Sequence, residues 1–169
     1  MLTVDLVRLE KQGRLRIDEE LPPDFPLWEE GDVELAGPLV VRLEARRAGR
    51  DMLVEGRLSG EVVINCRRCL EPVRHRFDEE VSFFYRAGID RPTAEREEVY
   101  ALPAGEREVD LTDAVREHLL LSVPRLVECR ADCRGLCPRC GINLNDGTCS
   151  CEETDTDERW APFRGLKLD

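Results

Sequence analysis

Residues 52–86 read MLVEGRLSGEVVINCRRCLEPVRHRFDEEVSFFYR and decide the fold of this chain. Up to Cys66 the apolar residues, such as Met52 and Val54, occupy even-numbered positions. After the turn CRRCLEP they occupy odd-numbered positions, from Val73 onward. Such alternation predicts two long antiparallel strands that bury one face and expose the other.

A third strand is predicted just before these two. Val41, Leu43 and Ala45 alternate with charged residues, and a turn at residues 48–51 follows. Gly56 and Gly60 lie on the buried face of the next strand, where glycine predicts bends that curl the sheet. We therefore expect an α+β fold with an antiparallel β-meander that forms a partly closed barrel.

The segments around the meander are patterned less regularly. Residues 2–9 begin by alternating, which predicts a short strand. Residues 18–34 hold eight acids and no Lys or Arg, with three prolines, which predicts a flexible acidic connection. Residues 87–108 lack sustained periodicity and predict a long surface loop.

One main helix is predicted over residues 110–121. Asp110 is a suitable N-cap, Leu119 and Leu121 are expected on the buried side, and Pro124 stops the helix. We expect a β-rich core domain over residues 1–124, followed by a cysteine-rich zinc-ribbon-like module and C-terminal tail over residues 125–169.

Six of the eight cysteines lie between Cys129 and Cys151. The chain has no apolar run long enough for a membrane helix and no secretory signal pattern, so we expect a cytoplasmic protein whose thiols stay reduced. Under those conditions, clustered cysteines favour metal ligation over disulfides.

The first predicted metal site is a four-cysteine zinc site near the end of the chain. Cys137-Pro138-Arg139-Cys140-Gly141 has the spacing of a zinc knuckle, and a hairpin with its turn at residues 145–147 would return Cys149 and Cys151 to it. Cys133 could replace one of the last two ligands.

The second predicted site uses the remaining cysteines. Cys66 and Cys69 form a second Cys-x-x-Cys between two core strands, and Cys129 and Cys133 have the i, i+4 spacing of one helical turn. A zinc ion held by these four would join the tip of the meander to the segment after the helix. In the alternative interpretation, Cys66 and Cys69 stay unoccupied and only one zinc ion binds.

The sequence offers no sign of catalysis. His75 and His118 lie outside any ligand-like spacing and are expected to be packing or surface residues. We find no phosphate-binding loop, no nucleophile elbow and no HExxH motif. We therefore expect a protein that is not an enzyme and has no small-molecule substrate.

The chain is acidic, with a formal net charge of −11, but its arginines are concentrated in the middle of the sequence. Salt screens the interaction between charges that lie far apart, so a local cluster of arginines can bind phosphates although the whole chain is acidic. The candidate nucleic-acid-binding residues lie on the sheet, at its tip and in the cysteine segment: Arg67, Arg68, Arg74, Arg76, Arg134 and Arg139.

The string formed by CRRCLEP, DLTDAVREHLLLSVP and CRADCRGLCPRCGINLNDGTCSC resembles the bacterial YceD family of large ribosomal RNA subunit accumulation proteins. The resemblance runs from about Gly56 to Trp160. It implies a cytoplasmic role in large-subunit ribosomal RNA accumulation and ribosome assembly, and it brings no catalytic residues.

Two kinds of partner are compatible with this role. The arginines could contact ribosomal RNA precursor, or the acidic segments 18–34 and 152–158 could bind a basic large-subunit ribosomal protein or assembly factor. The competing functional hypothesis is a redox-sensing zinc chaperone, in which oxidation releases the metal. An enzyme acting on RNA ranks third.

Overall fold

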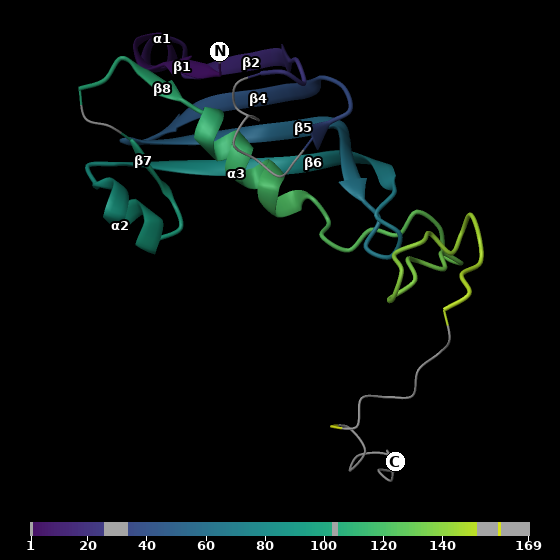
Figure 1. Cartoon of the computed structure of the whole chain (residues 1–169). Coiled ribbons are helices and arrows are strands. Elements are labelled where there is room, and N and C mark those ends of the chain that lie inside the picture. Colours follow the sequence, from purple (N-terminus) through teal and green to yellow (C-terminus); the bar gives the residue numbers. More distant parts are fainter. Residues whose placement is uncertain (1, 26–33, 103–104, 152–158, 160–169) are drawn as a thin grey trace, which may run out of the picture.

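A computed structural model describes residues 2–25, 34–102, 105–151 and 159. Its main sheet contains β2 (Arg14–Leu21), β4 (Leu39–Ala48), β5 (Asp51–Asn65), β6 (Pro72–Ala87) and β7 (Tyr100–Leu102), in that order. The short strand β3 (Glu34–Leu35) pairs with β5. A separate ribbon joins β1 (Thr3–Asp5) to β8 (Glu108–Asp110) (Figure 1).

The predicted meander is confirmed in strand order and in face. β4, β5 and β6 are consecutive antiparallel neighbours, with Val54 opposite both Ala45 and Phe83. Even positions of β5 and odd positions of β4 and β6 carry the buried side chains. Alternation predicted this arrangement because the side-chain period of a strand is two.

The prediction of a partly closed barrel is wrong. β2 and β7 lie at opposite ends of the strand order, and in the described parts of the chain they do not pair with each other. Gly56 nevertheless marks a close approach of two strands, because a Cβ there would lie 2.1 Å from the carbonyl oxygen of Arg42. The glycine thus serves contact between β4 and β5 in an open sheet.

Helix α3 (Thr112–Ser122) crosses one face of the sheet (Figure 1). Ala114, Val115 and Leu119 are buried, and they join the main core with residues of β5 and β6. The helix begins two residues later than predicted, and its N-cap is Leu111, although Asp110 Oδ1 accepts a hydrogen bond from Thr112 N at 2.8 Å. Leu121, predicted to be buried, is 75% exposed.

The N-terminal predictions need two corrections. Only Thr3–Asp5 is strand, because Asp5 caps helix α1 (Leu6–Gln12) by accepting from Arg8 N at 2.9 Å, and Gly13 ends it with φ 76°. Residues 18–21 belong to β2, which pairs with β4 and buries Leu21. Residues 26–33 of the predicted flexible segment lie outside the described residues.

The long loop predicted over residues 87–108 is also wrong in part. It contains helix α2 (Arg91–Arg96), β7 and β8. Asp90 caps α2 by accepting from Thr93 N at 3.0 Å, and Pro92 lies in its first turn. These elements are shorter than the window in which periodicity can be recognised, so the sequence pattern did not predict them.

Candidate metal centres at the tip of the sheet

The turn between β5 and β6 forms the first half of a cysteine-rich tip. Cys66 and Cys69 are buried, and Leu70 N donates to Cys66 O at 2.9 Å to close the turn. Arg67 N donates to Val127 O at 2.8 Å, so the segment after α3 is fastened to this turn. In Figure 1 that segment lies beyond the end of the sheet, beside the β5–β6 turn.

Cys66, Cys69, Cys129 and Cys133 form what we call the bridging cluster. Their four sulfur atoms all lie within 4.8 Å of one another. Cys66 Sγ is 3.9 Å from Cys133 Sγ, and Cys69 Sγ is 3.6 Å from Cys129 Sγ. Cysteines some 60 positions apart in the sequence thus meet at one point, as the sequence predicted for the second metal site.

Cys137, Cys140, Cys149 and Cys151 form the terminal cluster, again with all sulfurs within 4.8 Å. Cys149 Sγ lies 3.5 Å from Cys137 Sγ. The knuckle closes through Gly141 N, which donates to Cys137 O at 3.0 Å, and Gly141 has the expected positive φ of 73°. The alternative grouping with Cys133 in this cluster does not occur.

Both clusters fit a tetrahedral metal ion. A zinc ion with Zn–S bonds of about 2.3 Å requires sulfurs about 3.8 Å apart, and the measured separations fall on either side of that value. All eight cysteines are free thiols. Four sulfurs arranged around one point suit a thiophilic divalent metal, with no position left open for a substrate.

Backbone N–H groups of the two knuckles favour the thiolate form. The N–H of Cys69 holds the pKa of Cys66 at about 6, and the N–H groups of Cys140 and Arg139 do the same for Cys137. Desolvation raises the pKa of Cys129 to about 12, so that thiol keeps its proton until a metal displaces it. Metal uptake is therefore expected to release protons.

The backbone of the cysteine segment differs from the predicted one. Cys129 and Cys133 are brought together by a turn, with Cys133 N donating to Arg130 O at 3.2 Å, and not by a helix. The predicted hairpin after Gly141 is confirmed in its turn, where Asp146 N and Gly147 N both donate to Asn143 O at 3.2 Å, but the two strands beside the turn do not form in the described residues.

Asn145 connects the two clusters, a role that the sequence did not indicate. It lies in the loop between the two ligand pairs of the terminal cluster, yet its Nδ2 lies 3.4 Å from Cys133 Sγ of the bridging cluster. Its Oδ1 accepts from Arg134 N at 2.8 Å. The available signal is a turn-forming Asn between Cys-x-x-Cys and Cys-x-Cys, and from the sequence this Asn indicates only a turn.

The structure divides the six candidate arginines into two groups. Arg74 and Arg76 pair with Glu61 at 3.0 and 3.3 Å, and Arg67 Nε pairs with Glu128 at 2.9 Å. The other three are exposed and form no ion pair with a carboxylate of the described chain: Arg68, Arg134 and Arg139. Their role in binding nucleic acid stays a prediction.

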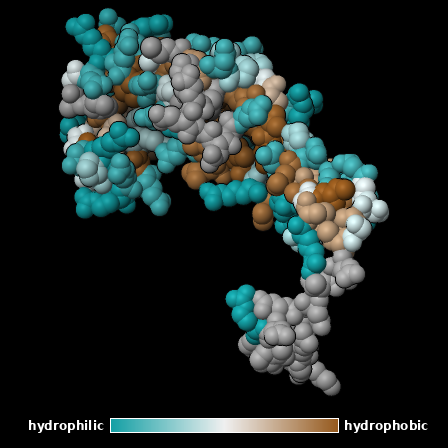
Figure 2. Space-filling model, in the orientation of Figure 1, coloured by the Kyte–Doolittle hydropathy of each residue, from teal (hydrophilic) through white to brown (hydrophobic). Residues whose placement is uncertain are grey.

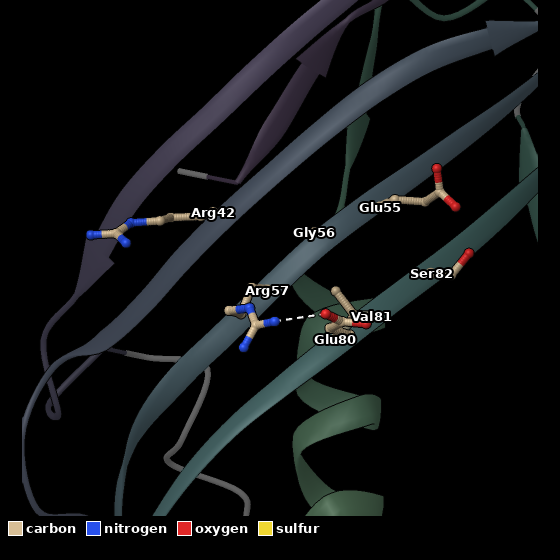
Figure 3. A pocket seen from close by; sticks show the side chains of 7 residues that line it. All are labelled: Arg42, Glu55, Gly56, Arg57, Glu80, Val81 and Ser82. Atoms are coloured by element: carbon tan, nitrogen blue, oxygen red, sulfur yellow. Dashed lines mark hydrogen bonds and ion pairs between the residues drawn. The ribbon is translucent and has the colours of Figure 1, made fainter.

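The two histidines and a depression on the sheet do not form a competing site within the described part of the chain. His118 packs edge-on against Phe83, with ring centroids 6.0 Å apart, and His75 lies half-buried on β6. The outer face of the sheet has an open depression of about 490 Å³. Figure 3 shows the residues that line it, among them Arg57, whose Nη2 pairs with Glu80 at 2.6 Å. No described helix is long and apolar enough to cross a membrane.

Comparison with known proteins shows one family model and several relatives that are similar to this chain. The family model for the large ribosomal RNA subunit accumulation protein YceD matches residues 54–167. An uncharacterized protein of Mycobacterium tuberculosis is 34% identical over 125 residues, covering 73% of this chain and 58% of the relative. One from Mycobacterium leprae is 28% identical over 114 residues, covering 66% and 52%.

A more distant similarity reaches a plant protein. The Arabidopsis thaliana protein named large ribosomal RNA subunit accumulation protein YCED homolog 1, chloroplastic, is 22% identical over 158 residues, covering 77% of this chain and 49% of the relative. The chain thus spans between about half and three fifths of the length of these relatives. No solved structure matches the chain significantly. The family model covers two thirds of the sequence, including both cysteine clusters, and the chain belongs to the YceD family.

Proposed function

We propose that this chain is a zinc-binding factor that supports accumulation of large-subunit ribosomal RNA, and so ribosome assembly, by binding without catalysis. The family description and the name of the Arabidopsis relative support the ribosomal part of the proposal. The bridging cluster supports the zinc-binding part, because its four sulfurs come from the β5–β6 turn and from the segment after α3, so that a metal ion there would join the two. We also propose that it acts in the cytoplasm.

The surface proposed to contact the ribosomal precursor centres on Arg68 and Arg134. A Cβ on Gly135 would lie 3.0 Å from the carbonyl oxygen of Arg68, which places the loop of Arg134 directly against the tip. A metal-held loop presents guanidinium groups with little loss of backbone freedom, and such groups bind phosphate oxygens in a bidentate manner. The observation favours ribosomal RNA over a basic protein as the immediate contact.

The experiment is co-sedimentation with large-subunit precursor particles. The double variant R68E and R134E is expected to lose association at least about tenfold while keeping its metal, since two phosphate contacts become repulsive. The matched control is R8E with R14E, which makes the same charge change on α1 and β2, away from the cysteine clusters. Equal binding by both double variants would contradict the arginine surface.

Arg67 is unsuitable for this experiment. Its guanidinium pairs with Glu128 of the cysteine segment, so R67E would disturb the contact that holds the tip together. The distinction follows from the structure, because Arg67 and Arg68 are equivalent in the sequence.

A redox-sensing chaperone is the second candidate, favoured by the exposure of Cys129 and Cys140. In that function, peroxide would take two electrons from a pair of thiolates, giving a disulfide and water, and the zinc would leave. The two functions differ after oxidation: the chaperone gains affinity for unfolded clients, whereas the assembly factor only loses precursor binding. Aggregation assays with a model client, before and after peroxide, separate them.

A further inference from the structure

β6 presents a long strand edge that nothing in the described chain covers. It pairs with β5 over residues 72–85 on one side, but on the other side β7 reaches only Tyr85, Arg86 and Ala87. Residues 73–84 form no backbone hydrogen bond on that second side with any described residue. We call these twelve residues the β6 edge; in Figure 1 the edge borders the main sheet next to the cysteine-rich tip.

An uncovered edge can template pairing with another strand, and proteins commonly prevent this with charge. The β6 edge carries charge, but in a particular order. Three basic or titratable side chains precede Phe77, namely Arg74, His75 and Arg76, and three acids follow it, namely Asp78, Glu79 and Glu80. A uniform charge would repel a second copy, whereas this order does not.

The charges become complementary when two copies of the edge run antiparallel with Phe77 opposite Phe77. Positions whose numbers sum to 154 then face each other, which places Arg74 opposite Glu80 and Arg76 opposite Asp78. His75 faces Glu79, and Val73 faces Val81. Opposite-charge and β-branched pairs directly across two strands are stabilising.

The same pattern disfavours the two neighbouring registers. A shift of the centre by one residue keeps one complementary pair, Arg74 with Asp78 or Arg76 with Glu80, and brings Arg76 opposite its own copy in one direction and Asp78 opposite its own copy in the other. Like charges directly opposite destabilise a sheet. The sequence of β6 therefore specifies one antiparallel register with a two-fold axis at Phe77, as an isologous interface requires.

The charged side chains of the β6 edge already form ion pairs within the chain, but each can bind a further partner. Arg74 and Arg76 share Glu61 within the chain, and Asp78 and Glu80 share Arg57. The four side chains at positions 74, 76, 78 and 80 remain between 58% and 88% exposed. Guanidinium has five donors and carboxylate about four acceptor sites, so each can add a partner without losing the first.

We propose that the β6 edge pairs with the β6 edge of a second copy of this chain, forming a two-fold symmetric dimer with one continuous sheet. The two cysteine-rich tips then lie at opposite ends of the interface, with the two Pro72 residues roughly 30 Å apart along the strands. The dimer would present two copies of the metal-held tip, one at either end of the shared strands.

Two charge variants test the proposal. Variant A, R74E with R76E, makes positions 74, 76, 78 and 80 all acidic, and variant B, D78R with E80R, makes the same four positions all basic. Each variant alone is expected to dimerise at least about tenfold more weakly than the natural chain, as measured by sedimentation over a range of concentrations. Mixed in equal amounts, A and B face each other with four complementary pairs and are expected to form a one-to-one heterodimer.

Both variants also break intramolecular pairs with Glu61 or Arg57, so their folding is checked by circular dichroism. The control R42E with R46E makes the same charge change as variant A on β4, away from the edge, and is expected to dimerise like the natural chain. Hydrogen exchange gives a readout independent of mutation: those amides of residues 73–84 that point away from β5 should be protected more at high than at low protein concentration.

A natural chain that stays monomeric at high concentration would overturn the proposal. So would a mixture of folded A and B that fails to associate. Protection of the β6 edge that does not depend on concentration would show that another segment of the same chain covers it, and this also overturns the proposal.

Discussion

Leu70 and Gly141 occupy the same position in two similar turns. Each follows the second cysteine of a Cys-x-x-Cys and donates its N–H to the carbonyl of the first, at 2.9 and 3.0 Å. Each has positive φ, 62° for Leu70 and 73° for Gly141. A residue with a Cβ is destabilised by about 1–2 kcal/mol in this conformation. Because Leu70 is 61% exposed, contacts of its side chain offset little of that cost.

This comparison predicts opposite effects of two substitutions. Leu70→Gly is expected to raise the free energy of unfolding by up to about 1 kcal/mol, because it removes the strain. Gly141→Ala is expected to lower it by about 1 kcal/mol, because it introduces the same strain. Urea denaturation of the metal-loaded chain measures both. A decrease for Leu70→Gly would mean that the Leu70 side chain makes stabilising contacts.

The contact of Asn145 with Cys133 predicts that a residue in the loop of the terminal cluster supports metal binding at the bridging cluster. Replacing Asn145 with Ala removes the N–H that approaches Cys133 Sγ, and loss of such an outer contact typically weakens metal affinity by about 10- to 100-fold. We expect the weakening at the bridging cluster only. Competition with a chromophoric chelator resolves the two binding steps, and Asp146→Ala, an exposed neighbour, is the control. Equal affinities in both variants would refute the coupling.

At the scale of elements, the long strands could be predicted and the short elements could not. β5 and β6 extend over 15 and 16 residues with one buried face, so alternation determined both their type and the face that they bury. β1 and β8 have three residues each and pair across more than 100 positions of sequence, which leaves no local pattern. The grouping of cysteines into two fours was predictable because Cys-x-x-Cys turns supply ligands in pairs.

The two leucines near the end of α3 test which side of the helix packs against the sheet. Leu119 is 1% exposed in the main core, and Leu121 is 75% exposed. Leu119→Ala is therefore expected to cost about 2–5 kcal/mol of unfolding free energy. Leu121→Ala should change it by less than about 0.5 kcal/mol. Chemical denaturation compares them, and similar losses in both would mean that α3 packs differently.

At the scale of the whole molecule, the buried residues form two separate clusters. The main one contains most of the buried hydrophobic residues, which come from the sheet and from α1 and α3, whereas the second contains Cys66, Cys69 and Cys133 with Val73 and Leu136 beside them. Figure 2 shows hydrophobic residues both on the body and at the tip. The second cluster is too small to hold the cysteine segment by apolar burial alone. Metal ligation is therefore expected to supply its stability.

Removing the metal should then affect the two parts differently. A strong chelator is expected to loosen residues 125–151 while β4, β5 and β6 keep their structure, because the main core needs no metal. Amide exchange should rise in the cysteine segment and at the β5–β6 turn and stay slow in the strands. Uniform loss of protection, or none at all, would contradict this division.

In the function that we propose, two tetrahedral metal sites hold the tip of the sheet to the segment after α3. The most direct measurement is native mass spectrometry of the purified reduced chain, with metal analysis of the same sample. We predict two zinc ions per chain, with the eight thiols protected from alkylation until a chelator is added. A folded chain that carries no metal and joins its cysteines as disulfides would contradict the account.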